Sequence, residues 1–484
     1  MVGRNSGLCP SLGREADRSR LELRLFKVAA LTVRKGEKMV LTRRRFFYTG
    51  SAAALAVHAT ILRRPALAQA AALAASDRVR FALIGSGLRG CQHLMYSLTI
   101  PGVECVAVSD LYEGRQQAAR EYLKKDVPVT RDYRSILDRK DVDAILVATP
   151  DHQHSRIVED ACAAGKDVYC EKPLTHKVEE GFSIIDATQR NRRIVQAGAQ
   201  RVSSILFAKG KEIYDSGRLG KVYAIEGYTD RNSPGGAWEY PIPPDASEAT
   251  IDWNTFLAGA PKRPFDTARF FRWRCFTDYG EGLGGDLFVH LISGIQYITG
   301  VNMPPLRAQT TGGIFRWKDG REFPDLMETL YDYPDFRVSI RCNQNNDAGE
   351  STIFYGTKGT LTLATTTLTF QPQNVTEQPQ TYAMIGWPAK LRNEYLAEWN
   401  KEHPQTPVLS ASLNATAESF SVPPQYADTA DHQANFFQAV RTRKTPVEDA
   451  VFGNNAAISC HMANASYFNN SQVIWDAKEK RIKA

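Results

Sequence analysis

The sequence predicts two folded parts: an α/β domain built on a doubly wound parallel sheet, and an α+β C-terminal domain with a large, mostly antiparallel open sheet. Two observations predict them. From about residue 78 to 200, short β-branched runs alternate with helical stretches, and strands that alternate with helices form a parallel sheet. Beyond residue 200, strand-like runs follow one another across turns, which favours antiparallel pairing. We therefore place the two domains at 76–200 and 201–484.

The first domain contains five predicted strands, at 80–85, 104–109, 144–149, 167–171 and 193–198. Between these strands, the apolar residues of 114–125 and 155–165 recur at helical spacing. Gly165 is placed to end the second of these helices. Strand, helix and strand thus alternate throughout this part of the chain.

The second domain contains predicted strands at 221–230, 326–334, 336–344 and 351–372, and two predicted helices at 431–444 and 454–468. Two long segments interrupt this pattern. Residues 232–285 are rich in proline, glycine and aromatic side chains, and residues 373–425 are polar. Because long irregular segments inside a compact domain are usually functional loops, we expect 232–285 to border a binding site.

The positive net charge of +7 belongs to one end of the chain. Residues 1–75 hold 14 Lys and Arg against 4 Asp and Glu, whereas the remainder holds 46 basic and 49 acidic residues. The body of the protein therefore offers no electrostatic reason to bind nucleic acid. Its seven cysteines form no CxxC pair, so we expect neither a metal site nor a disulfide framework.

Residues 1–75 are typical of a twin-arginine export signal. Arg43 and Arg44 precede Phe46, an apolar run covers 48–62, and small residues at 65–75 suit cleavage after Ala68 or Ala70. The apolar run is too short for a membrane span, so we expect the mature protein to be periplasmic, without a membrane anchor, after passage through the twin-arginine translocase. A start at Met39 would give a leader of ordinary length, and we suspect that 1–38 precede the true start.

A glycine motif joins the first predicted strand to a helix. Gly85-x-Gly87-x-x-Gly90 allows a tight turn and brings the phosphates of a dinucleotide close to the helix N-terminus. Asp110 ends the next strand, 20 residues beyond Gly90, where a carboxylate binds the ribose hydroxyls of adenosine. This arrangement predicts a nicotinamide cofactor, and NAD over NADP, although Arg115 lies close enough in sequence to weaken that preference.

Polar residues also follow the later strands of the first domain. Thr149 and Pro150 lead to His154, and Glu171-Lys172-Pro173 ends the next strand. Strand ends at one edge of a parallel sheet meet at the ligand site. We expect Lys172 to bind or deprotonate a reacting hydroxyl. In the second domain, Asp286 and His290 stand at i and i+4 of a predicted helix, with His290 as candidate base and Asp286 to orient it or to hold the substrate.

With these motifs assembled, the chain resembles the glucose–fructose oxidoreductase/inositol dehydrogenase (Gfo/Idh/MocA) family over nearly all of 78–484. The resemblance is carried by GSGLRG, ATPDHQH, EKP, GAQR at 198–201 and the Asp286/His290 pair. It implies a Rossmann domain, a homo-oligomer, and hydride transfer between NAD(P) and a sugar or cyclitol. Two departures are Phe288, where the family often has glycine, and Asp151, where many members have Asn.

The resemblance assigns roles to particular residues. The implied catalytic residues are Lys172, Asp286 and His290. The implied cofactor residues are Gly85, Ser86, Gly87, Arg89, Gly90, Asp110, Thr149, Pro150, His154, Glu171 and Lys172. The aromatic insertion suits a sugar ring, and its arginines suit a carboxylate such as that of a uronic acid. Candidate substrate contacts are Arg201, Trp273 and Tyr279; no metal is expected.

Export restricts the chemistry, because the periplasm has no pool of free NAD. We therefore expect a tightly bound cofactor that the enzyme regenerates within its own cycle. One possibility is the oxidation of one sugar and reduction of another. The alternative is redox-neutral: transient oxidation of a hydroxyl permits glycoside cleavage or epimerisation before the hydride returns. A non-catalytic sugar- or nucleotide-binding protein is a third hypothesis. A cytoplasmic dehydrogenase would follow if the leader were not an export signal.

Overall fold

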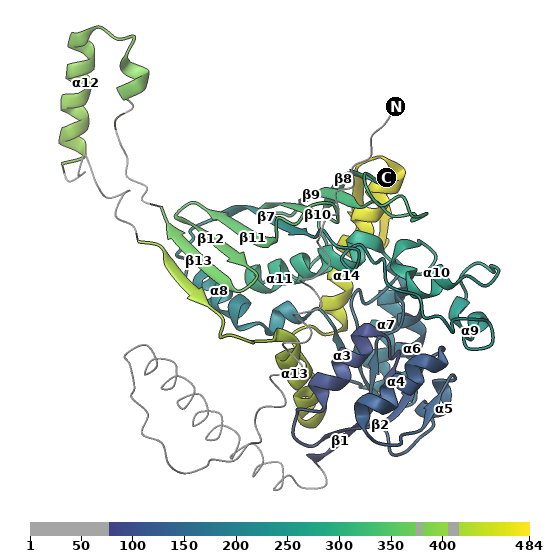
Figure 1. Ribbon diagram of the computed structural model, residues 1–484. Coiled ribbons are helices and arrows are strands. Elements are labelled where there is room, and N and C mark those ends of the chain that lie inside the picture. Colours follow the sequence, from purple (N-terminus) through teal and green to yellow (C-terminus); the bar gives the residue numbers. More distant parts are fainter. Residues whose placement is uncertain (1–76, 374–378, 380, 405–415) are drawn as a thin grey trace, which may run out of the picture. The chain divides into compact units, whose positions relative to one another are not determined.

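The computed structural model describes residues 77–373, 379, 381–404 and 416–484. The predicted export signal and its cleavage sites lie outside these residues. Two sheets organise the described chain: a six-stranded sheet near the purple and blue N-terminal helices and a ten-stranded sheet with the green strands (Figure 1). The predicted fold class, a parallel doubly wound sheet followed by an α+β part with a mostly antiparallel sheet, is confirmed.

The six-stranded sheet is parallel throughout. It comprises β1 (Val79–Ile84), β2 (Val103–Ser109), β3 (Val129–Thr130), β4 (Ala144–Val147), β5 (Asp167–Cys170) and β6 (Val195–Ala197). Their order is β3-β2-β1-β4-β5-β6, so the chain leaves the centre of the sheet in both directions. The switch point between β1 and β4 is where such sheets bind ligands. The strand β3 has only two residues, which is too short to be predicted from a sequence pattern.

Helices cover both faces of this sheet, and the strands alternate accordingly. Phe81 and Leu83 of β1 pack on one face with α3 (Leu88–Ser97) and α4 (Glu113–Leu123). Ala82 and Ile84 pack on the other. The helices of that second face are α5 (Arg134–Leu137), α6 (His154–Ala163) and α7 (Val178–Asn191). Both faces of the sheet are buried, as the near-continuous apolar strands predict.

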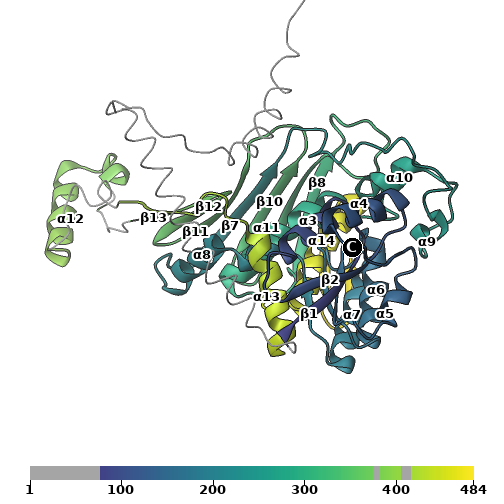
Figure 2. The ribbon, with the colours of Figure 1, turned by 60° about the horizontal axis from the view of Figure 1, so that its bottom comes forward.

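A helix from the far end of the chain completes the first of these faces. In α13 (Asp428–Thr442), Phe436 and Phe437 are fully buried in the same cluster as Phe81. Figures 1 and 2 both place α13 beside β1. The core of the parallel sheet therefore includes residues far outside the predicted range of 76–200, because a helix needs only an exposed apolar face to pack on, whatever its position in the chain.

The ten-stranded sheet is antiparallel except where β7 pairs with β10. Its order is β14-β13-β12-β11-β7-β10-β9-β8-β15-β16. The strands are β7 (Val222–Asp230), β8 (Arg307–Gly313), β9 (Leu326–Asp332), β10 (Arg337–Asn343), β11 (Glu350–Gly356), β12 (Gly359–Ala364), β13 (Thr367–Pro372), β14 (Glu418–Ser421), β15 (Val473–Asp476) and β16 (Arg481–Lys483). The sequence did not predict β8 and the short strands β14 to β16.

One face of this sheet is covered and the other is open. Figure 2 shows α8 (Ile205–Asp215), α11 (Val289–Thr299) and α14 (Ala450–Asn469) on the same side of the strands. Along β9, Met327 and Tyr331 are buried whereas Leu330 is 58% exposed. Period-two alternation of this kind is expected for a sheet with one solvated face. In α12 (Ala389–Glu402) no side chain is buried.

The aromatic insertion contributes to the core as well as to a binding site. It contains two short helices, α9 (Trp253–Leu257) and α10 (Thr267–Phe271), and the 3-10 turn η4 (Trp273–Cys275). Most of its aromatic rings are buried, including Trp238 and Phe256. It is therefore a packed wall between the two sheets rather than a loose loop.

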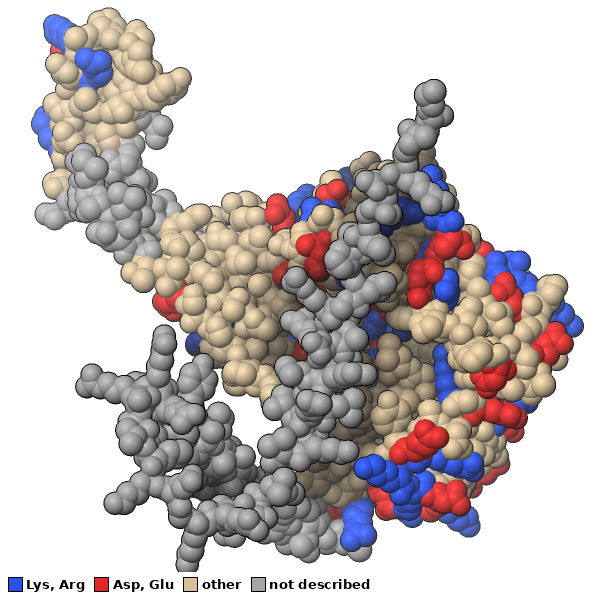
Figure 3. Space-filling view, viewed as in Figure 1, with Lys and Arg blue, Asp and Glu red and all other residues tan. Residues whose placement is uncertain are grey.

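The charged side chains, the cysteines and the helices of the described residues bear on the kind of surface and interior this protein has. On the face shown in Figure 3, basic and acidic side chains are interspersed over the parallel-sheet part, and the outer end of the larger sheet carries few charges. Every cysteine in the described residues is a free thiol, and all except Cys91 are buried. None of the helices in these residues is long and apolar enough to cross a membrane.

Candidate active site

A cavity of about 1210 Å³ lies at the carboxyl ends of β1, β2, β4 and β5. The parallel sheet supplies one wall. The aromatic insertion, the residue after β7 and the start of α11 supply the other. Of the predicted site residues, the cavity is lined by Gly85, Gly87, Arg89, Asp110, Thr149, Pro150, Glu171, Lys172, Trp273, Asp286 and His290. Residues separated by more than 200 positions thus meet at one site.

The glycine motif forms the turn between β1 and α3. Gly85 has a φ of +88°, and a Cβ there would lie 2.6 Å from the carbonyl oxygen of Ala148. A Cβ on Gly90 would lie 2.0 Å from the carbonyl oxygen of Gly85. Gly87 differs, because the nearest atom to its Cβ would be Arg115 Cζ at 3.4 Å. The fold requires the outer two glycines. A Cβ on Gly87 would make only an ordinary contact with Arg115, and Gly87 lines the cavity at the N-terminus of α3, where a phosphate can approach the backbone.

Asp110 is fixed by the glycine motif itself. Its carboxylate accepts hydrogen bonds from the backbone N–H of Ser86 at 2.7 Å and from that of Tyr112 at 3.0 Å. Arg115 lies beside Gly87, with Cζ over the rings of Phe270 and Phe271 at 5.4 and 5.1 Å. Asp110 and Arg115 thus lie at the same end of the cavity. Asp110 offers a hydrogen-bond acceptor there, and Arg115 offers a positive charge.

Glu171 is held by a chain of polar contacts that reaches α13. Its Oε1 accepts from Arg89 Nε at 2.9 Å and from His93 Nε2 at 2.8 Å, and His93 Nδ1 lies 2.8 Å from the amide nitrogen of Gln433. Burial lowers the pKa of His93, so a neutral ring that donates through Nε2 fits both contacts. Burial alone would raise the pKa of Glu171, but Arg89 and His93 hold it well below 4.5.

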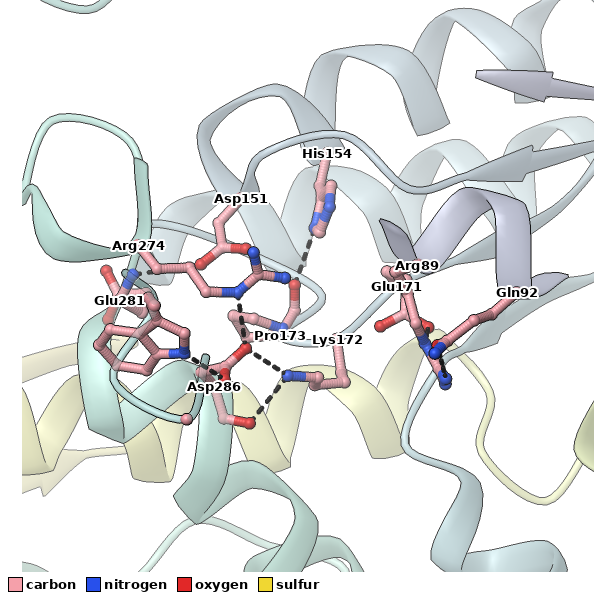
Figure 4. Close-up of polar contacts among 12 residues, drawn as sticks. Arg89, Gln92, Asp151, His154, Glu171, Lys172, Pro173, Arg274, Glu281 and Asp286 are labelled. Atoms are coloured by element: carbon pink, nitrogen blue, oxygen red, sulfur yellow. Dashed lines mark hydrogen bonds and ion pairs between the residues drawn. The ribbon is translucent and has the colours of Figure 1, made fainter. Parts of the chain in front are cut away.

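Lys172 and Asp286 form the centre of the site (Figure 4). Lys172 Nζ donates to the carboxylate and to the backbone carbonyl of Asp286, both at 2.8 Å. Arg274 Nε donates to the same carboxylate oxygen at 2.9 Å, and Trp238 Nε1 donates to the other at 3.1 Å. Burial alone would raise the pKa of Asp286, but Lys172 and Arg274 hold it well below 3.8. Asp286 is therefore a fixed anion.

His290 remains without a partner in the same cavity. Its Nδ1 is buried, and neither ring nitrogen makes a hydrogen bond within the described residues. Burial, followed by the charges of Lys172 and Arg201, lowers the pKa of His290 well below 6.5. A neutral imidazole has one unprotonated nitrogen. His290 is thus a free base at neutral pH.

A π-helix explains why Asp286 does not orient His290. Residues Gly284–Phe288 form one π-helical turn before α11 begins at Val289. Such a turn changes the register expected of an i, i+4 pair in a regular helix. The Asp286 carboxylate accordingly contacts Lys172, Arg274 and Trp238, not His290.

Five predicted site residues do not line the cavity. Ser86 and Gly90 belong to the glycine turn, and the other three make contacts elsewhere. His154 is fully buried, with Nδ1 2.8 Å from the carbonyl oxygen of Pro173 and Nε2 3.0 Å from that of Thr149, so it joins two strand-end loops (Figure 4). Arg201 forms an ion pair with Glu350 at 2.5 Å. Tyr279 is fully buried against Phe256. In place of His154, the lining residue is His152.

Sequence reasoning missed Arg231 and Tyr240 of the cavity wall and the role of Arg274. Arg274 lies beside Trp273, with Cζ 4.2 Å from the ring centroid. The only sequence signal for Arg274 was its position in the aromatic and glycine-rich insertion 232–285, which was expected to border a binding site. The partners of these residues come from other parts of the chain, so no local pattern identifies them.

The cavity suits a dinucleotide. Eight basic side chains and three acidic ones line it, and the excess is of the sign that two phosphates need. The basic residues are Arg89, Arg115, Arg131, Arg134, Arg156, Lys172, Arg231 and Arg274; the acidic ones are Asp110, Glu171 and Asp286. Within the described residues, no cluster of three or more His, Cys, Asp or Glu is placed to hold a metal ion.

Comparison with known proteins supports a dinucleotide site in the first domain. Residues 79–199 match the GFO_IDH_MocA family, described as an oxidoreductase family with an NAD-binding Rossmann fold. The chain is 33% identical over 147 residues to inositol 2-dehydrogenase of Salmonella typhimurium (strain LT2), covering 30% of this chain and 44% of that protein. It is 32% identical over 161 residues to scyllo-inositol 2-dehydrogenase (NAD(+)) of Bacillus subtilis (strain 168), covering 32% and 46%. The chain therefore spans about half the length of these curated relatives.

Solved structures extend the likeness of fold to the second domain. Levoglucosan dehydrogenase in complex with NADH and levoglucosan superposes with a TM-score of 0.61 at 16% identity, over 82% of this chain and 99% of that one. An aldose-aldose oxidoreductase from Caulobacter crescentus in complex with glycerol gives 0.59 at 14% identity, over 82% and 99%. At these identities, the likeness shows the fold alone.

Proposed function

We propose that this protein is an NAD(P)-dependent oxidoreductase of the Gfo/Idh/MocA family that acts on a CH–OH group of a sugar, a cyclitol or a sugar derivative. One observation carries the proposal. Lys172 and the unpaired His290 border the same cavity as the glycine turn, so a proton acceptor and a dinucleotide site meet there. The similarity of residues 79–199 to an NAD-binding oxidoreductase family supports it.

The residues of the glycine-turn end would hold the cofactor. The N-terminus of α3 and the cavity-lining Gly87 fit a pyrophosphate, and Asp110 fits the ribose hydroxyls of adenosine. A bound nicotinamide supplies hydride acceptance and hydride return. A carboxylate at Asp110 disfavours a 2′-phosphate, so NAD is the proposed cofactor, with NADP as the alternative that Arg115 leaves open.

In the proposed reaction, Lys172 orients the reacting hydroxyl and His290 takes its proton. The ammonium group of Lys172 has three N–H donors. Two of them donate to the backbone carbonyl and the carboxylate of Asp286, which leaves one donor for the substrate. Asp286 fixes the ammonium group in place and stays ionised throughout. His290 accepts the proton because its pKa, which burial holds low, leaves a ring nitrogen free.

The predicted export signal favours a second form of the same chemistry. An exported enzyme would keep its cofactor tightly bound and regenerate it, either with a second sugar or in a redox-neutral glycoside cleavage or epimerisation. A periplasmic location, delivery by the twin-arginine translocase and assembly into a homo-oligomer belong to this proposal. A non-catalytic binding protein would not need a free base at His290.

The test is the cofactor content of protein isolated from the periplasm without added nucleotide. Denatured protein should release about one NAD(H) per chain, measured by absorbance and mass spectrometry. Sugars, sugar pairs and glycosides would then be tested for turnover. Protein that carries no nucleotide and binds none when NADH is titrated would contradict the proposed function.

A further inference from the structure

Two of the arginines that line the cavity have no acidic partner among the described residues. Arg89 pairs with Glu171, Arg274 with Asp286, and Arg131, Arg134 and Arg156 pair with acids outside the cavity. The two exceptions are Arg115 and Arg231. They lie on opposite walls, since Arg115 stands on the parallel-sheet side next to Gly87 and Arg231 directly follows β7 of the larger sheet.

The acids near Arg231 are already bound to other groups. Asp230, its neighbour in sequence, pairs with Arg341 at 2.7 Å and with Asn343. Glu350 pairs with Arg201. Asp347, which lines a smaller pocket together with Arg231, accepts a hydrogen bond from the backbone N–H of Gly349 at 3.1 Å. The charge of Arg231 contributes to the low pKa of Asp286, but the Asp286 carboxylate accepts its hydrogen bonds from three other side chains. The guanidinium of Arg231 makes neither a hydrogen bond nor an ion pair within the described residues, although it is partly buried in the cavity wall.

The charges at this end of the cavity do not balance. Lys172, Arg231 and Arg274 are cations, and Asp286 is the one anion among the lining residues there. Glu171 does not offset the excess, because Arg89 already neutralises it. A partly desolvated cation without an acidic partner is costly, so an anion that enters this end of the cavity would be stabilised.

Two neutral hydrogen-bonding groups line the same cavity as Arg231. The hydroxyl of Tyr240 lines the cavity and makes no hydrogen bond within the described residues. The amide oxygen of Gln200 is buried and also has no partner. Such groups match the hydroxyls of a sugar, whereas the guanidinium matches a carboxylate, which it binds through two parallel N–H donors.

We propose that the substrate is a sugar acid, and that Arg231 binds its carboxylate while Lys172 and His290 act on one of its hydroxyls. The proposal rests on the proposed function and narrows its substrate class. A single guanidinium at the substrate end fits a singly charged, planar carboxylate. The second unpaired guanidinium, Arg115, stands at the glycine-turn end and is left for the cofactor.

The experiment compares sugars that differ by one carboxylate. Full-length protein loaded with NADH is titrated by calorimetry with D-glucuronate, D-gluconate, D-glucose and D-glucose 6-phosphate, and kcat/KM is measured with NAD for each. Wild-type protein should bind a carboxylate sugar about 10- to 100-fold more tightly than glucose, as expected for a hydrogen-bonded charge pair. Raising the ionic strength should reduce this ratio, which tests the charge pair without any variant.

Three variants sharpen the comparison. Arg231→Met should bring the ratio close to one through the dissociation constant of the carboxylate sugar, and Arg231→Lys should retain part of it. Arg337→Met is the matched control. It removes one arginine charge from the same sheet, but Arg337 is exposed and pairs with Asp332. That variant should keep the wild-type ratio.

Each result decides between the two proposals. If NADH binds and glucose or the 6-phosphate binds as well as the carboxylate sugars, or if none of the four binds, the sugar-acid proposal is overturned while the dehydrogenase remains. Equal losses in Arg231→Met and Arg337→Met would also overturn it. Failure of NADH itself to bind would instead contradict the proposed function.

Discussion

The two ends of the cavity are built in different ways. At the glycine-turn end, Asp110 accepts from the backbone of Ser86 and Tyr112, and all three residues lie within 79–112. At the catalytic end, the carboxylate of Asp286 contacts Lys172, which is 114 positions away, and Trp238, which is 48 positions away. The first end uses backbone groups that a short motif specifies. The second uses side chains that only the packing of the two sheets brings together.

The same contrast appears in the two buried carboxylates. Glu171 and Asp286 both have a pKa well below the ordinary value, because buried cations oppose the effect of burial. Glu171 is held by Arg89 and His93 on the cofactor side, and Asp286 by Lys172 and Arg274 on the substrate side. Both are fixed anions that position their neighbours. In the proposed reaction, the proton goes instead to His290, a neutral group that lines the same cavity.

The largest effect is expected when the catalytic end is broken at Lys172. Lys172→Ala should lower kcat by about 100- to 10,000-fold, because the hydroxyl loses its positioned donor. The glycine turn is untouched, so NADH should still bind, as measured by fluorescence titration. Lys177→Ala, which changes an exposed lysine five residues later, should match wild type. Loss of NADH binding together with activity would place Lys172 in the cofactor site instead.

Replacement of His290 should have the next largest effect. His290→Asn should lower kcat by about 100-fold without changing NADH affinity. Because the pKa of His290 is held well below 6.5, the ring is unprotonated above that pH and becomes protonated only as the pH falls below it. The kcat/KM of wild-type enzyme should therefore be flat from pH 6.5 to 8 and fall only at lower pH. A wild-type acid limb centred above pH 6.5 would rule out this assignment.

Two glycines of one turn separate ligand binding from folding. Gly87→Ala should leave stability close to wild type, because its Cβ would make only an ordinary contact with Arg115. It should weaken NADH binding roughly 10-fold, because the added methyl group stands on the cavity wall where the phosphate is proposed to bind. Gly90→Ala should cost about 1–3 kcal/mol of unfolding free energy, measured with urea, because its Cβ meets the carbonyl of Gly85. The proposed phosphate position would be refuted if Gly87→Ala bound NADH normally.

The smallest expected effect concerns Asp110. Asp110→Asn keeps a hydrogen-bond acceptor but removes the charge that repels a 2′-phosphate, so the preference for NAD over NADP should fall about fivefold, or ~1 kcal/mol. The ratio of the two kcat/KM values measures it. Asp126→Asn, an exposed aspartate on the same domain, is the control. An unchanged preference would show that Asp110 does not contact the ribose.

Much of the fold and part of the site could be predicted from the sequence. Contiguous patterns sufficed for the parallel strands, for the glycine turn and for the strand-end position of Lys172. They did not show that His154, Arg201 and Tyr279, which were expected at the site, do not line the cavity. These three side chains satisfy their polar groups or bury their rings behind the wall, and a single sequence does not show on which side of a wall a side chain lies.

The sequence by itself determined what depends on neighbouring residues: the alternation of strands and helices, the glycine conformations and the acidic residue at the end of β2. Tertiary structure decided what depends on distant ones. It brought α13 onto the parallel sheet and surrounded Asp286 with Lys172, Arg274 and Trp238. It also left Arg231 without an acidic partner among the residues that the structure describes. The reason is physical: backbone geometry is set locally, whereas the charge balance of a buried site depends on every side chain that packing brings into it.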